Sequence, residues 1–283
     1  MISIVCVYNN KYILKNYLIR SLKNQTGDYE AIFINNTKGK FKSAAEALNY
    51  GGKRAKGEYI MFVHQDVYLC SNTWLEEAER VLNSLPNLGV AGVSGKKENG
   101  KFVLTSVIHG DPPTLAGEIL IKKPTKVQTL DECLLIVPKH IFNILKFDES
   151  TCRGWHLYGV DYCLSVKKLG FEVYVLPLPT YHKSTGINKK RFIEIILSLE
   201  PHPTEYYQDL KKLLLKHREV KKICTTCGDW TSNHPMLLQK LRNLISGGAR
   251  FALRFILEKI YYKSVVNTHC YYWRDKIENS PSI

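Results

Sequence analysis

The chain has 283 residues, of which 45% are hydrophobic, 23% charged and 11% aromatic. This composition excludes wholesale disorder, collagen-like repeats and a disulfide-stapled miniprotein, and it is typical of one large α/β domain with an appendage. The formal net charge of +14 predicts a phosphate-rich partner, although charge alone does not distinguish nucleic acid, anionic lipid and nucleotide-activated substrates.

The cysteine pattern indicates the cellular compartment. Eight cysteines occur at irregular spacing, and the first ten residues lack the basic segment of a secretory signal. We therefore expect a reducing, cytoplasmic environment. No run approaches the roughly 18 apolar residues that a membrane span requires, so we expect at most peripheral contact with the inner face of a membrane.

Short apolar runs alternate with helical patterns along the first 186 residues. The runs predict strands at 2–8, 29–34, 59–63, 89–93, 102–108, 133–137 and 171–176. Helices are predicted between them, near 12–22, 43–55, 73–86, 139–145 and 160–169. This alternation predicts a Rossmann-like, mostly parallel central sheet flanked by helices.

The region after Gly186 differs from the rest of the chain because it is basic and mostly helical in pattern. Half of the net positive charge lies after residue 200. We therefore expect a first domain over 1–186 and a basic helical C-terminal extension over 187–283.

Polar residues directly follow the first three predicted strands. Tyr8 ends the first strand, Asn35 and Asn36 end the second, and His64-Gln65-Asp66 follows the third. Open parallel sheets bind ligands at the carboxyl ends of their strands, so these residues are candidates for a binding site. Turn chemistry alone is the alternative explanation for the asparagines.

A carboxylate and an imidazole two positions apart could both face a cation at that edge of the sheet. Mg²⁺ prefers oxygen ligands and Mn²⁺ also accepts imidazole, so either ion, together with a diphosphate, is compatible with His64 and Asp66.

The run from Ser43 to Tyr68, SAAEALNYGGKRAKGEYIMFVHQDVY, resembles the donor-binding half of family 2 glycosyltransferases of the GT-A fold. In that family the strand ends in an Asp-x-Asp signature that holds the metal and the nucleotide diphosphate. This chain resembles a subgroup that carries His-Gln-Asp instead. The resemblance continues from Leu130 to Gly186, through TLDECLLIVPKHIF, FDES, GWHLYGVDYCLSVKKLGFEVYVLP and YHKSTG.

The resemblance implies specific roles. Asp161 occupies the place of the catalytic base, and His182 occupies the place of a histidine that completes the metal shell with Asp66. His64 is left as either a ribose contact or a metal ligand. Val160 departs from the family, which has an acidic residue there. The alternatives are an aspartate that interacts with a helix dipole and a histidine satisfied within a loop.

The family pattern also implies a donor half near 1–95 and an acceptor half near 96–186. The residues expected to contact the donor are Tyr8, Asn35, Asn36, Lys53, His64, Gln65, Asp66 and Asp131. The residues expected to contact the acceptor are Glu132, Trp155 and His156. Trp155 is equally compatible with a place in the core.

The C-terminal region carries two further patterns. Cys224 and Cys227 have the spacing of half a zinc site, with His217 and His234 nearby, although two reduced thiols explain them equally simply. Helices predicted at 236–246 and 249–263 combine basic and aromatic residues, which is typical of a membrane-surface contact over 236–263. Packing on the catalytic domain is the alternative.

These observations favour an inverting, metal-dependent glycosyltransferase. It would move a sugar from a nucleotide-diphosphate donor, UDP-linked by family analogy, to a hydroxyl of a glycan or lipid-linked acceptor. Such a transfer needs a base for the hydroxyl and a cation for the departing diphosphate. A catalytically inactive nucleotide-sugar binder and a basic nucleic-acid-binding protein are the alternatives. We expect no nucleic-acid partner, because the sequence lacks RNP, KH and zinc-finger patterns.

Overall fold

The computed structural model describes residues 1–110, 113–183 and 202–246. The helix predicted at 249–263 and the predicted domain boundary at residue 186 lie outside these residues, so both stay predictions.

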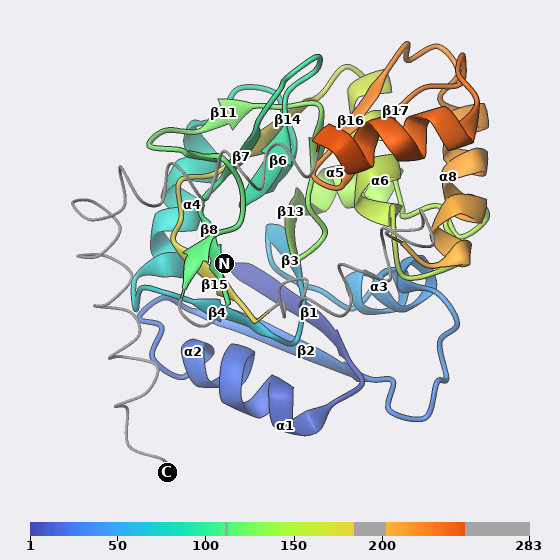
Figure 1. Cartoon of the computed structure of the whole chain (residues 1–283). Helices are drawn as coiled ribbons and strands as arrows, with labels where there is room; N and C mark the ends of the chain where they lie inside the picture. The colour runs from blue at the N-terminus through green and yellow to red at the C-terminus, as the bar shows by residue number, and fades with distance from the viewer. Residues whose placement is uncertain (111–112, 184–201, 247–283) are drawn as a thin grey trace.

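A seven-stranded sheet forms the centre of the molecule (Figure 1). Its strands are β1 (Ile2–Tyr8), β2 (Tyr29–Asn35), β3 (Tyr59–Val63), β5 (Leu88–Gly92), β11 (Thr125–Lys126), β13 (Leu134–Pro138) and β14 (Glu172–Val175). They lie side by side in the order β11-β14-β5-β13-β3-β1-β2. The α/β architecture predicted from the sequence is confirmed.

The sheet is mixed rather than mostly parallel. β1 runs parallel to β2 and β3, and β14 runs parallel to β5. β13 lies antiparallel between β3 and β5, and β11 is antiparallel to β14. The difference arises because the chain enters β13 from the edge at which β3 ends, as the register Leu134 opposite Val63 shows.

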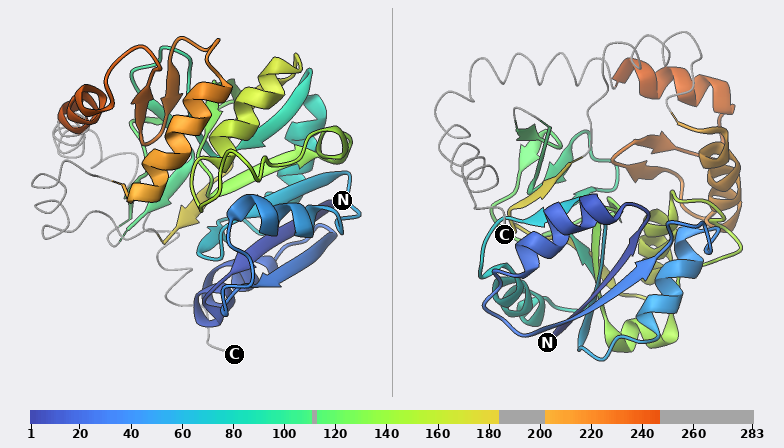
Figure 2. Two further views of the ribbon diagram at one scale, coloured as in Figure 1. Left: turned by 90° about the vertical axis from the view of Figure 1, so that its right-hand side faces the viewer. Right: turned by 90° about the horizontal axis from the view of Figure 1, so that it is seen from below.

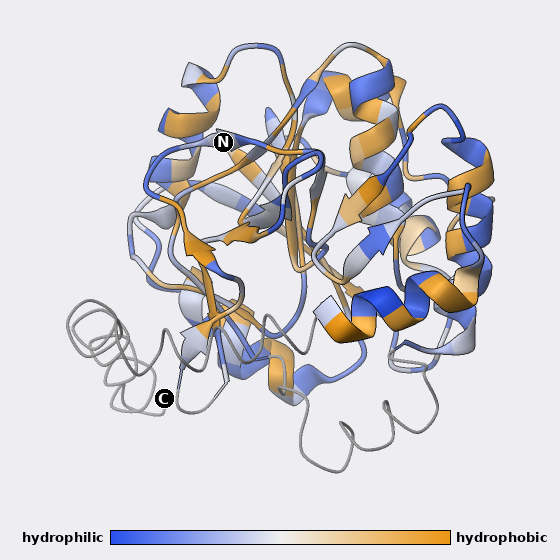
Figure 3. Cartoon of the chain, turned by 45° about the horizontal axis from the view of Figure 1, so that its top comes forward, coloured by the Kyte–Doolittle hydropathy of each residue, from blue (hydrophilic) through white to orange (hydrophobic). Residues whose placement is uncertain are grey.

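Helices cover both faces of the sheet, giving three layers (Figure 2). One face carries α1 (Lys11–Leu14), η1 (Lys15–Ile19), α2 (Arg20–Leu22) and α4 (Trp74–Ser84). The other carries α3 (Ala44–Gly52), α5 (Lys139–Ile144), α6 (Tyr158–Lys168) and α8 (Thr204–Lys216). Because side chains alternate along a strand, Ile4 and Cys6 join the first core and Val5 the second. Figure 3 shows the resulting hydrophobic strands between helices of mixed hydropathy.

Two smaller sheets accompany the central sheet. One contains β6 (Ser94–Lys96), β7 (Val103–Thr105), β10 (Ile119–Leu120) and β12 (Thr129–Leu130). The other contains β4 (Val67–Leu69), β8 (Val107–His109), β9 (Thr114–Leu115) and β15 (Thr180–His182). The strand predicted at 102–108 is therefore divided at Ser106, and its halves join different sheets. No helix among the described residues is both long and apolar enough to cross a bilayer.

The C-terminal segment is not wholly helical. After α8 it forms a hairpin of β16 (Ile223–Thr225) and β17 (Gly228–Trp230), followed by a helix at 236–246. The helical prediction was wrong for the hairpin because the Thr225 hydroxyl accepts the backbone N–H groups of Cys227 and Gly228 and closes a tight turn.

This segment packs into the main core rather than standing apart from it. Tyr206, Leu210 and Trp230 belong to the same buried cluster as the residues of α3 and α6. Cys224 is buried and Cys227 is exposed. Among the described residues, neither cysteine joins a group that could hold a metal ion, so the zinc alternative finds no support.

A buried ion pair fixes the hairpin to β6. Lys96 Nζ lies 2.7 Å from Asp229 Oδ1, and the Lys96 side chain is only 1% exposed. Asp229→Asn leaves that cation without its full counter-charge, so we expect a loss of unfolding free energy of about 3 kcal/mol. Urea denaturation measures it.

The matched control is Glu172→Gln. Lys126 and Glu172 are also 2.7 Å apart, but 56% and 29% exposed. An exposed pair contributes less than about 1 kcal/mol. Equal losses in the two variants would contradict the importance assigned to burial.

Candidate active site

A cavity of about 580 Å³ lies where β1, β2 and β3 end. Parallel strands expose their carboxyl ends at one edge of a sheet, which is where such folds bind ligands. The residues that line it are Val7, Tyr8, Asn9, Asn36, Gly39, Phe41, Lys42, Ala44, Leu48, Phe62, Val63, His64, Gln65, Asp66, Trp155 and Tyr158. Six of the predicted site residues are among them: Tyr8, Asn36, His64, Gln65, Asp66 and Trp155.

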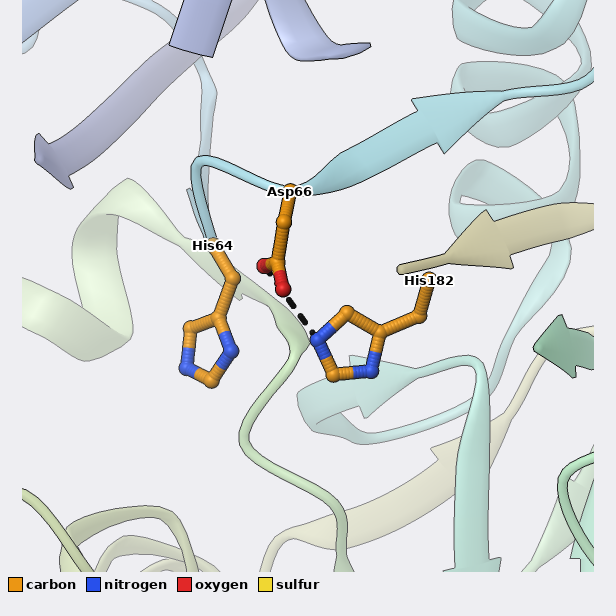
Figure 4. A group of neighbouring side chains, drawn as sticks. All are labelled: His64, Asp66 and His182. Carbon is orange, nitrogen blue, oxygen red and sulfur yellow. Dashed lines mark ion pairs between the residues drawn. The ribbon is translucent and has the colours of Figure 1, made fainter. Parts of the chain in front are cut away.

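Three metal-ligating side chains converge beside this cavity (Figure 4). His64 and Asp66 lie in the turn between β3 and β4, and His182 ends β15. β15 pairs antiparallel with β4, placing His182 opposite Val67, and Lys183 N–H donates to the Asp66 carbonyl. His182 Nε2 consequently lies 3.3 Å from Asp66 Oδ1. One ligand atom from each of the three residues lies within 4.8 Å of the others.

Tyr158 fixes the orientation of the His64 ring. Its hydroxyl donates to the Glu132 carbonyl at 3.3 Å and lies 3.1 Å from His64 Nε2. The hydroxyl has one proton, so the arrangement in which it donates to Glu132 and accepts from Nε2 of His64 leaves Nδ1 as an unprotonated acceptor. Figure 4 shows the other ring nitrogen on the side of Asp66 and His182. An oriented, neutral imidazole is the form that binds a metal ion.

The charges of the three residues are coupled. Burial lowers the pKa of His64, and the neighbouring His182 lowers it further. Burial also acts to lower the pKa of His182. The hydrogen bond from His182 to Asp66, together with the negative charges of Asp66 and Asp131, has the larger effect, so the pKa of His182 is raised. Burial acts to raise the pKa of Asp66, yet the same hydrogen bond holds it below its usual value.

This donor set fits a divalent cation. Two imidazoles and one carboxylate suit Mn²⁺ better than Mg²⁺, which prefers an all-oxygen shell. The sequence was compatible with two roles for His64, a contact to the ribose and a ligand of the metal ion. The position of His64 beside Asp66 and His182 favours the second role.

Several residues predicted to contact the donor form hydrogen bonds within the loops near the cavity. Gln65 Oε1 accepts the backbone N–H groups of Asn9 and Asn10, and its amide donates to Asn9 Oδ1. Asn36 exchanges two hydrogen bonds with the backbone of Phe41, and Asn35 accepts from Thr37. The side chains of Gln65 and Asn36 therefore shape the rim of the cavity, which Asn35 does not line.

Lys53 is not placed at this site. It follows α3, which runs back from the site, and it lies near Lys146 and Lys139 at the opposite edge of the sheet. The contact of Lys53 with a nucleoside stays a prediction, and the structure does not place Lys53 beside the cavity because the helix carries it away from the strand ends. The lysine that lines the cavity is Lys42. The run Lys38-Gly39-Lys40-Phe41-Lys42 after the second strand was the signal that could have identified it.

Asp161 is also apart from the cavity. Its carboxylate is only 2% exposed and accepts hydrogen bonds from Lys216 Nζ and His217 Nε2, each at 2.8 Å. Lys216 also binds Asp148. The sequence could not reveal this network, because Lys216 and His217 come from α8, beyond the segment that resembles the family. The geometry does not bring Asp161 together with Asp66 and His182.

Asp131 and Glu132 precede β13 at the same edge. Asp131 accepts the Cys133 N–H and the Thr226 hydroxyl, both at 3.0 Å, so the C-terminal hairpin reaches this edge. Glu132 Oε1 accepts the Gly159 N–H at 3.1 Å. Burial and then the charge of Asp131 raise the pKa of Glu132 to about 8. Trp155 and His156 are exposed in the loop before α6.

The raised pKa of Glu132 has a measurable effect on stability. Between its ordinary value of 4.5 and about pH 8, folded Glu132 retains a proton that the unfolded chain releases. This contribution to the unfolding free energy therefore falls as pH rises through that window. Glu132→Gln removes the ionisation and keeps an acceptor for Gly159, so we expect a shallower fall with pH.

Urea unfolding at a series of pH values measures this difference. Glu172→Gln serves as the control for loss of one carboxylate at the surface. The same pH slope in Glu132→Gln and the unaltered protein would contradict the assignment.

Comparison with known proteins agrees with this architecture. The model of a family described as "Glycosyltransferase like family" matches residues 2–197. The "ATP synthase subunits region ORF 6" protein of Fuscovulum blasticum is 28% identical over 150 residues, which cover 49% of this chain. The match spans 57% of that relative's length.

Two solved structures are similar to this chain. A mannosyltransferase of Pyrobaculum calidifontis, in complex with GDP-Man and Mn²⁺, has a TM-score of 0.50 at 11% identity, covering 89% of this chain and 74% of its own. TarS of S. aureus, in complex with UDP-GlcNAc, has a TM-score of 0.48 at 13% identity, covering 76% and 70%. The first likeness shows a shared fold, the GT-A fold that the sequence predicted.

Proposed function

Since the chain belongs to the glycosyltransferase-like family whose model spans residues 2–197, we propose that it transfers a sugar from a nucleotide-diphosphate donor with the help of a divalent cation. The observation that carries the proposal is the convergence of His64, Asp66 and His182 beside the cavity. We further propose that the His-Gln-Asp motif takes the role that Asp-x-Asp has in the family, which is to hold the metal and the nucleotide diphosphate.

The cavity suits such a donor. Its volume lies within the usual range for small-molecule sites. Tyr8 and Phe41 offer rings to a nucleoside, and Lys42 offers a positive charge to phosphate. The mannosyltransferase of the same fold was solved with a nucleotide sugar and Mn²⁺. A UDP-linked sugar is the donor that the family resemblance favours.

The site residues divide the work of the reaction. Asp66, His182 and His64 would hold the cation, and the Tyr158 hydroxyl orients the His64 ring. The bound cation would act as a Lewis acid on the diphosphate. Transfer in one displacement, assisted by one carboxylate base, inverts the anomeric carbon. The proposed acceptor is a hydroxyl of a glycan or lipid-linked sugar, and exposed Trp155 offers a ring for stacking.

Ligand binding tests the donor and the cation together. UDP with Mn²⁺ should raise the midpoint of thermal unfolding, because a ligand that binds only the folded state stabilises it. GDP with Mn²⁺ tests the base preference. Asp66→Asn and His182→Gln should abolish the effect of Mn²⁺, since each removes one of three ligands.

His140→Gln is the matched control, because His140 is an exposed histidine on α5. Stabilisation by an oligonucleotide but by no nucleoside diphosphate would favour the nucleic-acid alternative and contradict the proposal.

We also propose peripheral contact with an anionic membrane. The helix at 236–246 directs Gln239 and Asn243 inward, where they bind the backbone at Thr231 and Asp229. Leu237, Leu238 and Ile245 are left 58%, 57% and 71% exposed. An outward apolar face beside basic residues is typical of a helix that lies on a membrane surface.

Flotation with vesicles that contain anionic lipid tests this contact. The double variant Leu237→Glu, Leu238→Glu should bind vesicles less, because it removes apolar area and adds negative charge. Leu215→Glu, at a leucine of α8 that is 74% exposed, is the control. Equal flotation of both variants and the unaltered protein would refute the contact.

A further inference from the structure

The candidate carboxylates differ in the side chains and backbone groups that already contact them. Asp66 pairs with His182, Asp131 accepts from Cys133 and Thr226, and Asp161 accepts from Lys216 and His217. Asp161 is therefore held by two basic side chains in a buried network. Both of its carboxylate oxygens are thus engaged by basic side chains, and Asp161 does not line the cavity.

Glu132 differs from these three. The charge that acts on it is the negative charge of Asp131, and the groups that hold its carboxylate are backbone N–H groups at the start of α6. Within the described parts of the chain, no lysine, arginine or histidine forms an ion pair with it. The phenol of Tyr206 in α8 interacts electrostatically with Glu132, and it is neutral when protonated.

The backbone places Glu132 across from the metal-ligating motif. β13 pairs with β3 with Leu134 opposite Val63, and His64 N–H donates to the Cys133 carbonyl at 2.9 Å, extending the ladder by one step. Glu132 is the next residue beyond that step. Its own carbonyl accepts the Tyr158 hydroxyl that orients His64.

Gly159 makes room for this side chain. A Cβ at position 159 would lie 2.8 Å from Glu132 Cγ, too close for any other residue without a shift. Gly159 also gives its N–H to Glu132 Oε1. The start of α6 thus leaves space for the Glu132 side chain and donates a hydrogen bond to it. An acidic residue exposed to solvent would require neither.

We propose that Glu132, and not Asp161, takes the proton from the acceptor hydroxyl. The inference rests on the proposed glycosyl transfer. The acceptor oxygen forms a bond to the anomeric carbon as the bond from that carbon to the phosphate oxygen breaks. The electron pair leaves with the nucleoside diphosphate, and the acceptor proton goes to the Glu132 carboxylate.

Asp161 then acts as a positioning residue. Together with Asp148 it ties Lys216, at the end of α8, to the start of α6, where Gly159 and Tyr158 contact Glu132. Its loss should change the stability of this region rather than the protonation step. The pKa of Glu132, raised to about 8 chiefly by burial, is compatible with a group that exchanges a proton near neutral pH.

The test compares Glu132→Gln with Asp161→Asn in the full chain. The assay follows release of nucleoside diphosphate from UDP-linked and GDP-linked sugars with Mn²⁺, well below and well above pH 8. Loss of a general base lowers kcat by on the order of 100-fold or more. We expect that loss in Glu132→Gln, with the donor KM unchanged and the rise of rate with pH abolished. Glu132→Asp, which restores a shorter carboxylate, should recover part of the rate.

Asp161→Asn should instead lower the midpoint of thermal unfolding and keep the pH profile in its folded fraction. The reverse pattern, in which Asp161→Asn loses the pH-dependent limb and Glu132→Gln keeps it, would overturn the inference while leaving glycosyl transfer intact. An unaltered protein that acts on no nucleotide sugar and gains no stability from UDP with Mn²⁺ would overturn both.

A measurement without substrate gives a second check. Carbon NMR of protein labelled at glutamate carboxyls should show one carboxyl that titrates near pH 8. That signal should be absent in Glu132→Gln, whose thermal unfolding confirms that the variant is folded. Its persistence there would overturn the inference.

Discussion

The antiparallel pairing of β15 with β4 is the constraint on which the candidate site depends. Asp66 and His182 are far apart in the sequence, and their meeting is decided by the register that sets His182 opposite Val67. A shift by one residue would turn the imidazole to the other face of this small sheet. The backbone bond from Lys183 to Asp66 fixes that register at the point where the ligands are needed. The convergence of these side chains is therefore a property of the strand pairing, and the cavity beside them lies at the ends of β1, β2 and β3.

The C-terminal segment is the second determinant of the site. α8 supplies Lys216 and His217 to the network around Asp161, and the hairpin supplies Thr226 to Asp131. Both elements lie beyond the part of the chain that the family model matches. The segment matched by the family model thus supplies the cavity at the strand ends, while residues beyond it hold the carboxylates of Asp131 and Asp161.

The sequence predicted the elements whose patterns are local. Continuous apolar runs identified the strands of the central sheet, and polar residues after them identified Tyr8, His64 and Asp66 at the cavity. The family resemblance also implied that His182 joins Asp66. The features that could not be predicted depend on contacts between distant segments. The burial of Asp161 requires Lys216, the direction of β13 requires the path of the chain at the sheet edge, and the hairpin requires the turn at Thr225. Lys53 lies away from the cavity because a residue at the end of a helix lies a helix length away from the strand ends at which the helix begins.

The central claim, a cation held by His64, Asp66 and His182, is tested most directly by anomalous diffraction from crystals grown with Mn²⁺ and UDP. We expect an anomalous peak within coordination distance of all three side chains and in contact with the diphosphate. Bound UDP with the manganese peak elsewhere, or with these three side chains directed away from the diphosphate, would contradict it.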